Sequence, residues 1–336
     1  FAFFGACVGL FGIGTFSQVN GISSAVVGFF DPDKSFAVTI SGLGTYSWVV
    51  VIASLVLTFC VAAVIIGGVK RIASVSQVVV PFMAIIYFIF ALALVLCNIK
   101  EVPQAIVTIV QAAFNPKAVT GGVVGSMLVA MQNGVARGIF SNEAGLGSAP
   151  IAAAAAQTKE PVRQGLVSMT GTFIDTIVIC TLTGLSVVIT GAWQVEGLEG
   201  VQVTTYAFQN GLPFSNQFCA AILMICLVFF AFTTILGWDY YGERCLEYLT
   251  GKDEKKIKIY RWLYILAVFI GPYMTVAAVW TIADIFNGLM ALPNMIALFA
   301  LSSVVVKETK RFFDVYADQK MANKKSSASI KDAAEN

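Results

Sequence analysis

The sequence predicts an all-α protein that crosses a membrane several times. Of its 336 residues, 58% are hydrophobic and 12% are charged, and the mean hydropathy is +0.82. A soluble domain carries about 25% charged residues. The charges here gather in short clusters between apolar runs of about twenty residues, the length of a membrane-spanning helix. The alternative, a large soluble helical core, requires a polar face on each helix, and residues 49–66 and 78–96 offer none.

The composition also excludes several kinds of chemistry. The chain has no histidine, so it has no histidine metal site, serine–histidine triad or histidine proton relay. Its seven cysteines form no Cys-x-x-Cys pair, and six of them lie within or beside apolar runs, as small buried hydrophobic residues do. We therefore expect neither a bound cofactor nor a nucleic-acid partner.

Eight apolar segments are long enough to span a lipid bilayer as helices. They are residues 1–30, 46–66, 78–97, 121–156, 164–192, 216–240, 262–278 and 279–306. Residues 102–114 have the pattern of a short amphipathic surface helix. Residues 1–306 thus form a transmembrane domain, and the charged and polar residues 307–336 form a tail that we expect to be disordered. Because the chain begins at Phe1 inside an apolar run, we also expect an N-terminal truncation that removes further helices.

The distribution of positive charge predicts the orientation. One set of alternate loops, together with the tail, holds 17 of the 21 lysines and arginines, whereas the opposite loops hold three and Arg137 lies inside segment 121–156. Loops rich in lysine and arginine remain in the cytoplasm. We therefore expect a multi-pass inner-membrane protein with a cytoplasmic C-terminus, and the regular alternation supports the count of eight helices.

Segment 121–156 carries an unusual number of polar residues for a membrane span. Its 36 residues exceed what one straight helix needs to cross about 30 Å of hydrocarbon. We predict two shorter helices joined by an unwound stretch at Asn133 and Gly134, beside Gln132, with Ser141 or Asn142 as the N-cap of the second helix. Exposed backbone at membrane depth lines cavities, and broken helices form the binding sites of secondary transporters. A kinked helix packed through its glycines is the alternative.

The same segment contains a long motif. Residues 133–150, NGVARGIFSNEAGLGSAP, resemble the signature of the alanine or glycine:cation symporter family. Similar stretches are 11–14 with Gln18, 67–72, 172–176 and 283–294, so the resemblance covers the chain up to its tail. It implies an inverted-repeat bundle of the leucine-transporter type, in which the eight segments correspond to the third to tenth core helices. It also implies sodium as the coupling ion and alanine or glycine as substrate, with the first broken core helix, half of the substrate site, absent from this chain.

The resemblance assigns roles to polar residues outside that segment. In leucine-transporter-type bundles, adjacent hydroxyls on the eighth core helix bind sodium, a role that falls here to Thr233 and Thr234. The alternative is that each hydroxyl bonds the carbonyl four residues earlier. Thr15 and Gln18, which share a helix face with Gly14, are expected to face the substrate or to form hydrogen bonds between helices.

Another helix face carries Trp280, Asp284 and Asn287, at positions i, i+4 and i+7. Trp280 is expected either to wall the substrate pocket or to lie in the aromatic belt at the membrane interface. Asp284 is a charge within an apolar segment. Such a charge is energetically costly, so we expect it to serve a function. Pro293 is expected to end this helix.

Three further charges fall within apolar segments. Asp175 has no basic residue in its own helix, which leaves pairing with Arg137, hydrogen bonds from hydroxyls, or protonation. Arg137 and Glu143 lie in the inner half of segment 121–156, where they can form an inner gate.

These observations predict a secondary active transporter that carries small neutral amino acids with sodium by alternating access. A channel would need a continuous polar pore, and the polar residues concentrate at one depth. A membrane enzyme would need converging catalytic groups or a metal cluster, and apart from sodium we expect no bound metal. These two classes are the alternatives.

Overall fold

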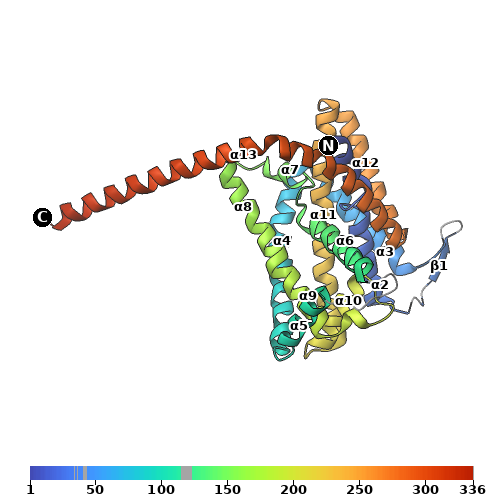
Figure 1. Ribbon diagram of the computed structural model, residues 1–336. Helices are drawn as coiled ribbons and strands as arrows, with labels where there is room; N and C mark the ends of the chain where they lie inside the picture. The colour runs from blue at the N-terminus through green and yellow to red at the C-terminus, as the bar shows by residue number, and fades with distance from the viewer. Residues whose placement is uncertain (34, 36, 41–43, 115–122, 336) are drawn as a thin grey trace.

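The described residues fold into a bundle of helices with a small β-hairpin (Figure 1). The computed structural model describes residues 1–33, 35, 37–40, 44–114 and 123–335. The elements are α1 (Ala2–Phe11), α2 (Phe16–Phe30), β1 (Ala37–Ile40), β2 (Gly44–Ser47), α3 (Trp48–Ile65), α4 (Val69–Cys97), α5 (Val102–Phe114), α6 (Val123–Asn142), α7 (Ala149–Ala153), α8 (Pro161–Phe173), the π-helix η1 (Ile174–Cys180), α9 (Thr181–Ile189), η2 (Ala192–Gln194), α10 (Val201–Gly211), α11 (Asn216–Thr250), α12 (Glu254–Ile270), η3 (Gly271–Tyr273) and α13 (Val276–Glu335).

Six stretches of the described helices are long and apolar enough to cross a membrane, as in an integral membrane protein. They are Ala2–Phe30, Trp48–Ile65, Val69–Cys97, Pro161–Ile189, Asn216–Thr250 and Val276–Tyr316. Six of the eight expected spans are thereby found. The other two correspond to α6, which carries two amides and Arg137 in its second half, and to α12, which has only 17 residues and begins with charged ones.

The first span is two helices, not the single one expected for residues 1–30. α1 ends at Phe11 and α2 begins at Phe16. The backbone between them presses against α11, because a Cβ on Gly14 would lie 2.2 Å from Trp238 Cβ. Thr15 and Gly14 therefore lie in a break. The prediction that they share a helix face with Gln18 is wrong. The apolar run hides this break, and only the glycines of the sequence GLFGIG mark it.

The predicted unwinding at Asn133 and Gly134 is wrong. α6 runs unbroken through both residues to Asn142, and the chain leaves the helix at 143–148. Glu143, Gly145 and Gly147 there have φ values of 54°, 78° and 86°, a left-handed conformation that favours glycine. Ser148, and neither Ser141 nor Asn142, precedes the next helix, α7. Two residues of the expected segment, 121 and 122, lie outside the described residues.

Several helix ends also differ from the expected ones. The fifth expected span, 164–192, contains the π-helix η1, and α11 continues ten residues beyond the expected end at Tyr240. The pair Gly271–Pro272 separates α12 from α13, so the boundary lies before the expected one at 278. Pro293 does not end α13, since neighbouring turns can compensate for a missing N–H.

The tail is helical and not disordered: α13 extends to Glu335 and leaves the bundle (Figure 1). Its alanines, lysines and glutamates have high helix propensity, and they continue a helix already nucleated in the bundle. The amphipathic helix expected at 102–114 is confirmed as α5. The hairpin β1–β2 and the helix α10 were not expected.

The helix α11 lies at the centre of the bundle and packs against α1, α2, α4, α10 and α12. The largest buried cluster includes Val19, Ile65, Ile235, Tyr264 and Val268, all with no exposed surface. The central position of α11 places its polar residues where other helices enclose them.

Candidate functional site

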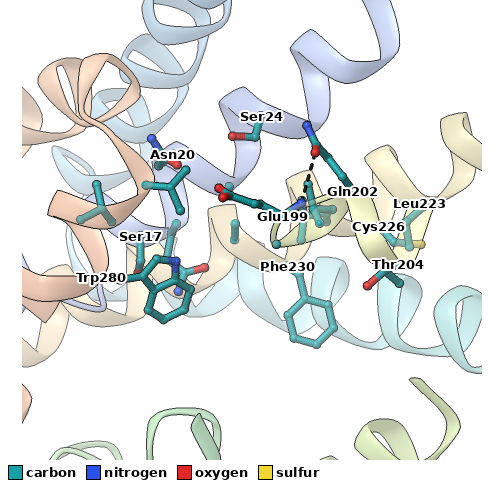
Figure 2. A pocket seen from close by; sticks show the side chains of 18 of the residues that line it. Ser17, Asn20, Ser24, Glu199, Gln202, Thr204, Leu223, Cys226, Phe230 and Trp280 are labelled. Atoms are coloured by element: carbon teal, nitrogen blue, oxygen red, sulfur yellow. Dashed lines mark hydrogen bonds between the residues drawn. The ribbon is translucent and has the colours of Figure 1, made fainter. Parts of the chain in front are cut away.

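A cavity of about 630 Å³ lies between α2, α11 and α13, with contributions from α4, α6, η1 and the loop before α10 (Figure 2). Its volume lies in the range of about 300–1,000 Å³ that is typical of small-molecule sites. The wall is mainly apolar, with a limited set of polar side chains, the composition expected of a site that orients a small polar ligand.

One wall is the polar face of α2. Ser17, Gln18 and Ser24 line the cavity from this helix, at positions i, i+1 and i+7, together with Asn20. Ser17 Oγ donates to the carbonyl of Ile13 over 2.7 Å, and Gln18 Nε2 donates to the same oxygen over 3.1 Å. The break between α1 and α2 frees this carbonyl from helical bonding. The break therefore fixes the two side chains that start the polar wall.

Two aromatic side chains form another wall. Trp280 of α13 and Phe140 of α6 both line the cavity, with their ring centroids 5.0 Å apart. The guanidinium carbon of Arg137 lies 4.2 Å from the centroid of the Trp280 ring. Arg137 Nη2 in turn bonds Asp284 Oδ2 over 2.6 Å. This arrangement holds the indole between the cavity and a pair of opposite charges.

The loop before α10 closes a third side, which had not been predicted. Glu199, Gln202 and Thr204 line the cavity from this loop and the start of α10 (Figure 2). The backbone N–H of Glu199 donates to Gln202 Oε1 over 3.3 Å. Gly197 and Gly200 have φ values of 82° and 54°. These glycines were the available signal, because they mark a loop of fixed shape.

Of the residues predicted to bind substrate, Gln18 and Trp280 line this cavity. Thr15 is fully buried in the break, where its hydroxyl donates to the carbonyl of Gly9. Gln132, Asn133 and Gly134 lie on exposed parts of α6 and are not among the lining residues.

Ser141 and Asn142 bond the π-helix η1. Ser141 Oγ donates to Asp175 Oδ2 over 2.5 Å, and Asn142 Nδ2 donates to Thr176 Oγ1 over 2.6 Å. Of the three alternatives for Asp175, the structure therefore shows hydrogen bonding from a hydroxyl. Pairing between Asp175 and Arg137 is not found, because Arg137 pairs with Asp284.

The hydroxyls of Thr233 and Thr234 both bond helix carbonyls. Thr233 Oγ1 donates to Phe229 O over 3.1 Å and to Phe230 O over 3.0 Å, and Thr234 Oγ1 donates to Phe230 O over 2.9 Å. This is the bonding that the alternative interpretation expected. It uses the hydroxyl protons and leaves oxygen lone pairs, so it is compatible with a later role as cation ligands.

Glu143 does not form a gate pair with Arg137. Its carboxylate accepts a hydrogen bond from Ser148 Oγ over 2.7 Å, across the break between α6 and α7. Asn294 Nδ2 of α13 donates to the carbonyl of Gly145 over 2.9 Å in the same break. Glu143 and Asn294 thus stabilise the broken backbone.

Comparison with known proteins places these features in a family. The model of the sodium:alanine symporter family matches residues 1–328. A protein of Haemophilus influenzae described as an uncharacterized transporter is 52% identical over 93% of this chain. The sodium/alanine symporter AgcS of Methanococcus maripaludis is 46% identical over 94% of the chain. The probable sodium/glutamine symporter GlnT of Bacillus subtilis is 38% identical over 80% of it.

The chain spans less than two thirds of the length of these relatives. It covers 64% of the Haemophilus protein, 64% of AgcS and 54% of GlnT. The family match nevertheless extends over nearly all of its residues, including every helix that lines the cavity. The chain belongs to the sodium:alanine symporter family.

Proposed function

We propose that the protein is a sodium-coupled symporter of small neutral amino acids, and that the cavity between α2, α11 and α13 holds the amino acid. The observation that carries the proposal is the meeting of the Gln18 amide and the Trp280 indole in one cavity of a chain from this family. The names of AgcS and GlnT, a sodium/alanine symporter and a probable sodium/glutamine symporter, support the substrate class.

The proposed roles follow from the chemistry of the walls. A zwitterion carries an ammonium group. The Gln18 amide oxygen can accept a hydrogen bond from this group while Nε2 still donates to the Ile13 carbonyl. Trp280 and Phe140 limit the volume beside the substrate side chain, which favours small residues. No covalent step is required, so the side chains need only bind and orient.

Sodium in this proposal binds beside the cavity, at Thr233 and Thr234. Phe230 and Ala231 of α11 line the cavity, so these hydroxyls lie within one turn of it. Neutral oxygens are suitable ligands for a hard cation. Sodium and substrate bound on the same helix would each tighten the binding of the other.

Transport then proceeds by alternating access in a leucine-transporter-type bundle, with the C-terminus in the cytoplasm. The pair Arg137–Asp284 lies against Trp280, with side-chain exposures of 40% and 45%. An exposed ion pair is worth about 0–1 kcal/mol, so it can open and close during a cycle. We assign it to a gate next to the substrate.

The test is uptake of labelled alanine into proteoliposomes under an inward sodium gradient. The proposal expects accumulation above the external concentration, and collapse of that accumulation when an ionophore removes the gradient. Gln18→Leu should abolish uptake, whereas Gln104→Leu on the exposed surface of α5 serves as the matched control. Downhill movement that ignores sodium would indicate a channel, and chemical conversion of alanine would indicate an enzyme; either result contradicts the proposal.

A further inference from the structure

Asp239 of α11 is a buried carboxyl group that the proposed transport site does not use. The residue is 1% exposed, and neither of its carboxyl oxygens has a hydrogen-bond partner among the described residues. It does not line the cavity. Buried polar groups are almost always hydrogen-bonded, and a buried charge without a partner is far more costly still. Asp239 therefore needs an explanation.

The nearby charges do not neutralise it. Glu243, one turn further along α11, is 2% exposed and is paired with Arg261 of α12 through two hydrogen bonds, one of which joins Arg261 Nη2 and Glu243 Oε2 over 2.8 Å. This pair is neutral as a unit. The carboxyl of Asp239 remains as a second acidic group beside a single guanidinium.

The remaining titratable neighbours are two tyrosines whose hydroxyl protons are already used. On α12, Tyr260 Oη donates to Ala6 O over 2.9 Å, and Tyr264 Oη donates to Ile235 O over 2.7 Å. The groups that act electrostatically on Asp239 are thus Glu243 on its own helix, and Arg261, Tyr260 and Tyr264 on α12. Two thiols, Cys7 on α1 and Cys245 on α11, act electrostatically on Tyr260.

The packing closes this region to water. Tyr260 Oη fits between α1 and α11 because both helices have glycine there. A Cβ on Gly9 would lie 2.7 Å from this hydroxyl oxygen, and a Cβ on Gly242 would lie 1.9 Å from it. Because Asp239 beside this junction is only 1% exposed, we expect proton exchange with solvent to need separation of these helices.

We propose that Asp239 is a proton-binding site, and that its carboxyl is neutral in the conformation described here. A proton needs no further ligands, whereas sodium needs several oxygens. The two tyrosine hydroxyls nearby donate to carbonyls and not to Asp239, and neither of its carboxyl oxygens has a hydrogen-bond partner among the described residues. The proton is held where α1, α11 and α12 meet, so its release is coupled to movement of these helices. This inference does not depend on the identity of the transported substrate.

Infrared spectroscopy tests the proposal on the purified, membrane-reconstituted protein. At neutral pH without sodium, we expect a carbonyl stretching band of a protonated carboxyl group, which shifts when the protein is labelled with 13C-aspartate. Asp239→Asn should lose this band, and Asp253→Asn, at the exposed N-cap of α12, should keep it. Where Asp239→Asn fails to fold, Asp239→Glu in protein labelled with 13C-aspartate gives the assignment, because the band of an unlabelled glutamate should no longer shift.

Thermal unfolding gives a second readout. The unfolded chain releases the proton of Asp239 at neutral pH and the folded protein retains it, so stability should fall as pH rises. Asp239→Asn, which has a similar shape and cannot ionise, should remove this part of the pH dependence. Absence of a labelled protonated band would show that Asp239 is ionised and would overturn the proposal.

Discussion

The guanidinium carbon of Arg137 lies 4.2 Å from the centre of the Trp280 ring, while Nη2 of the same side chain lies 2.6 Å from Asp284 Oδ2. Arg137 and Trp280 come from α6 and α13 and are 143 residues apart in the sequence. The contact links a charge inside an apolar region to the aromatic wall of the cavity. It determines how that wall should respond to substitution.

Trp280→Ala should widen the amino-acid selectivity of uptake. Removing the indole opens the wall next to Phe140, so larger side chains such as that of leucine no longer clash. Overpacking costs about 1–3 kcal/mol, so leucine should compete with alanine about tenfold better or more. The measurement is inhibition of labelled alanine uptake by a series of amino acids. Trp262→Ala, at a 60% exposed position of α12, is the control. An unchanged size limit in Trp280→Ala would remove Trp280 from the site.

The pair of Arg137 and Asp284 should show a small but measurable coupling. A double-mutant cycle with Arg137→Gln and Asp284→Asn should give about 0.2–1 kcal/mol, because both side chains are partly exposed. The exposed pair Arg311 and Glu308 on α13, spaced i, i+3, provides a reference of about 0.2–0.5 kcal/mol for stability. The cycle should be read on alanine affinity as well as on thermal unfolding. A coupling in stability without one in affinity would contradict the assignment of this pair to the gate.

Thr233→Val and Thr234→Val should each raise the sodium concentration for half-maximal uptake by about tenfold. The estimate assumes that an oxygen dipole facing a cation is worth about 1.5 kcal/mol or more. Thr250→Val is a close control, since the Thr250 hydroxyl makes the same kind of bond, to Leu246 O over 2.9 Å, on the same helix. Unaltered sodium dependence in both variants, with Thr250→Val behaving likewise, would leave the hydroxyls a purely structural role.

The position of the break in segment 121–156 can be tested with glycine substitutions. Gly134→Ala should stabilise the protein by about 0.5–1 kcal/mol, because Gly134 lies within the continuous helix α6 and nothing lies within 4 Å of a Cβ placed there. Gly145→Ala should destabilise it by about 1–2 kcal/mol, because φ there is 78°.

Thermal unfolding in detergent measures both effects. Gly138→Ala, in the same helix and also with open space, should behave like Gly134→Ala. A lower unfolding temperature for Gly134→Ala would place the break where the sequence had suggested.

Gly242→Ala should destabilise the junction of α1, α11 and α12 by about 1–3 kcal/mol, because the new Cβ would collide with Tyr260 Oη. Gly237→Ala is the matched control on the same helix, since nothing lies within 4 Å of its Cβ position. Adding Tyr260→Phe to Gly242→Ala removes the colliding oxygen and should recover part of the loss. Equal unfolding temperatures for the two glycine variants would show that this packing is looser than described.

The sequence by itself determined that the protein is helical and built for a membrane, because long apolar runs and segregated charges are properties of the chain alone. The family motif at 133–150 and the roles suggested for Gln18 and Trp280 also came from residue identities. Gln18 and Trp280 do meet in one cavity. The helix breaks were harder to place, because an apolar run conceals a short glycine loop and the amides of Gln132 and Asn133 fit an intact helix as well as a broken one.

Only the tertiary structure decided which polar groups satisfy one another. Arg137 pairs with Asp284 and Asp175 with Ser141, choices that depend on how α6 lies against α13 and η1. The loop carrying Glu199 reaches the cavity only through folding. Asp239 gave no signal in the sequence, where GWDYYGER reads as the polar end of a span. It becomes conspicuous when α1 and α12 enclose it, since burial turns an ordinary carboxyl into a group that must bind a proton or bear an uncompensated charge.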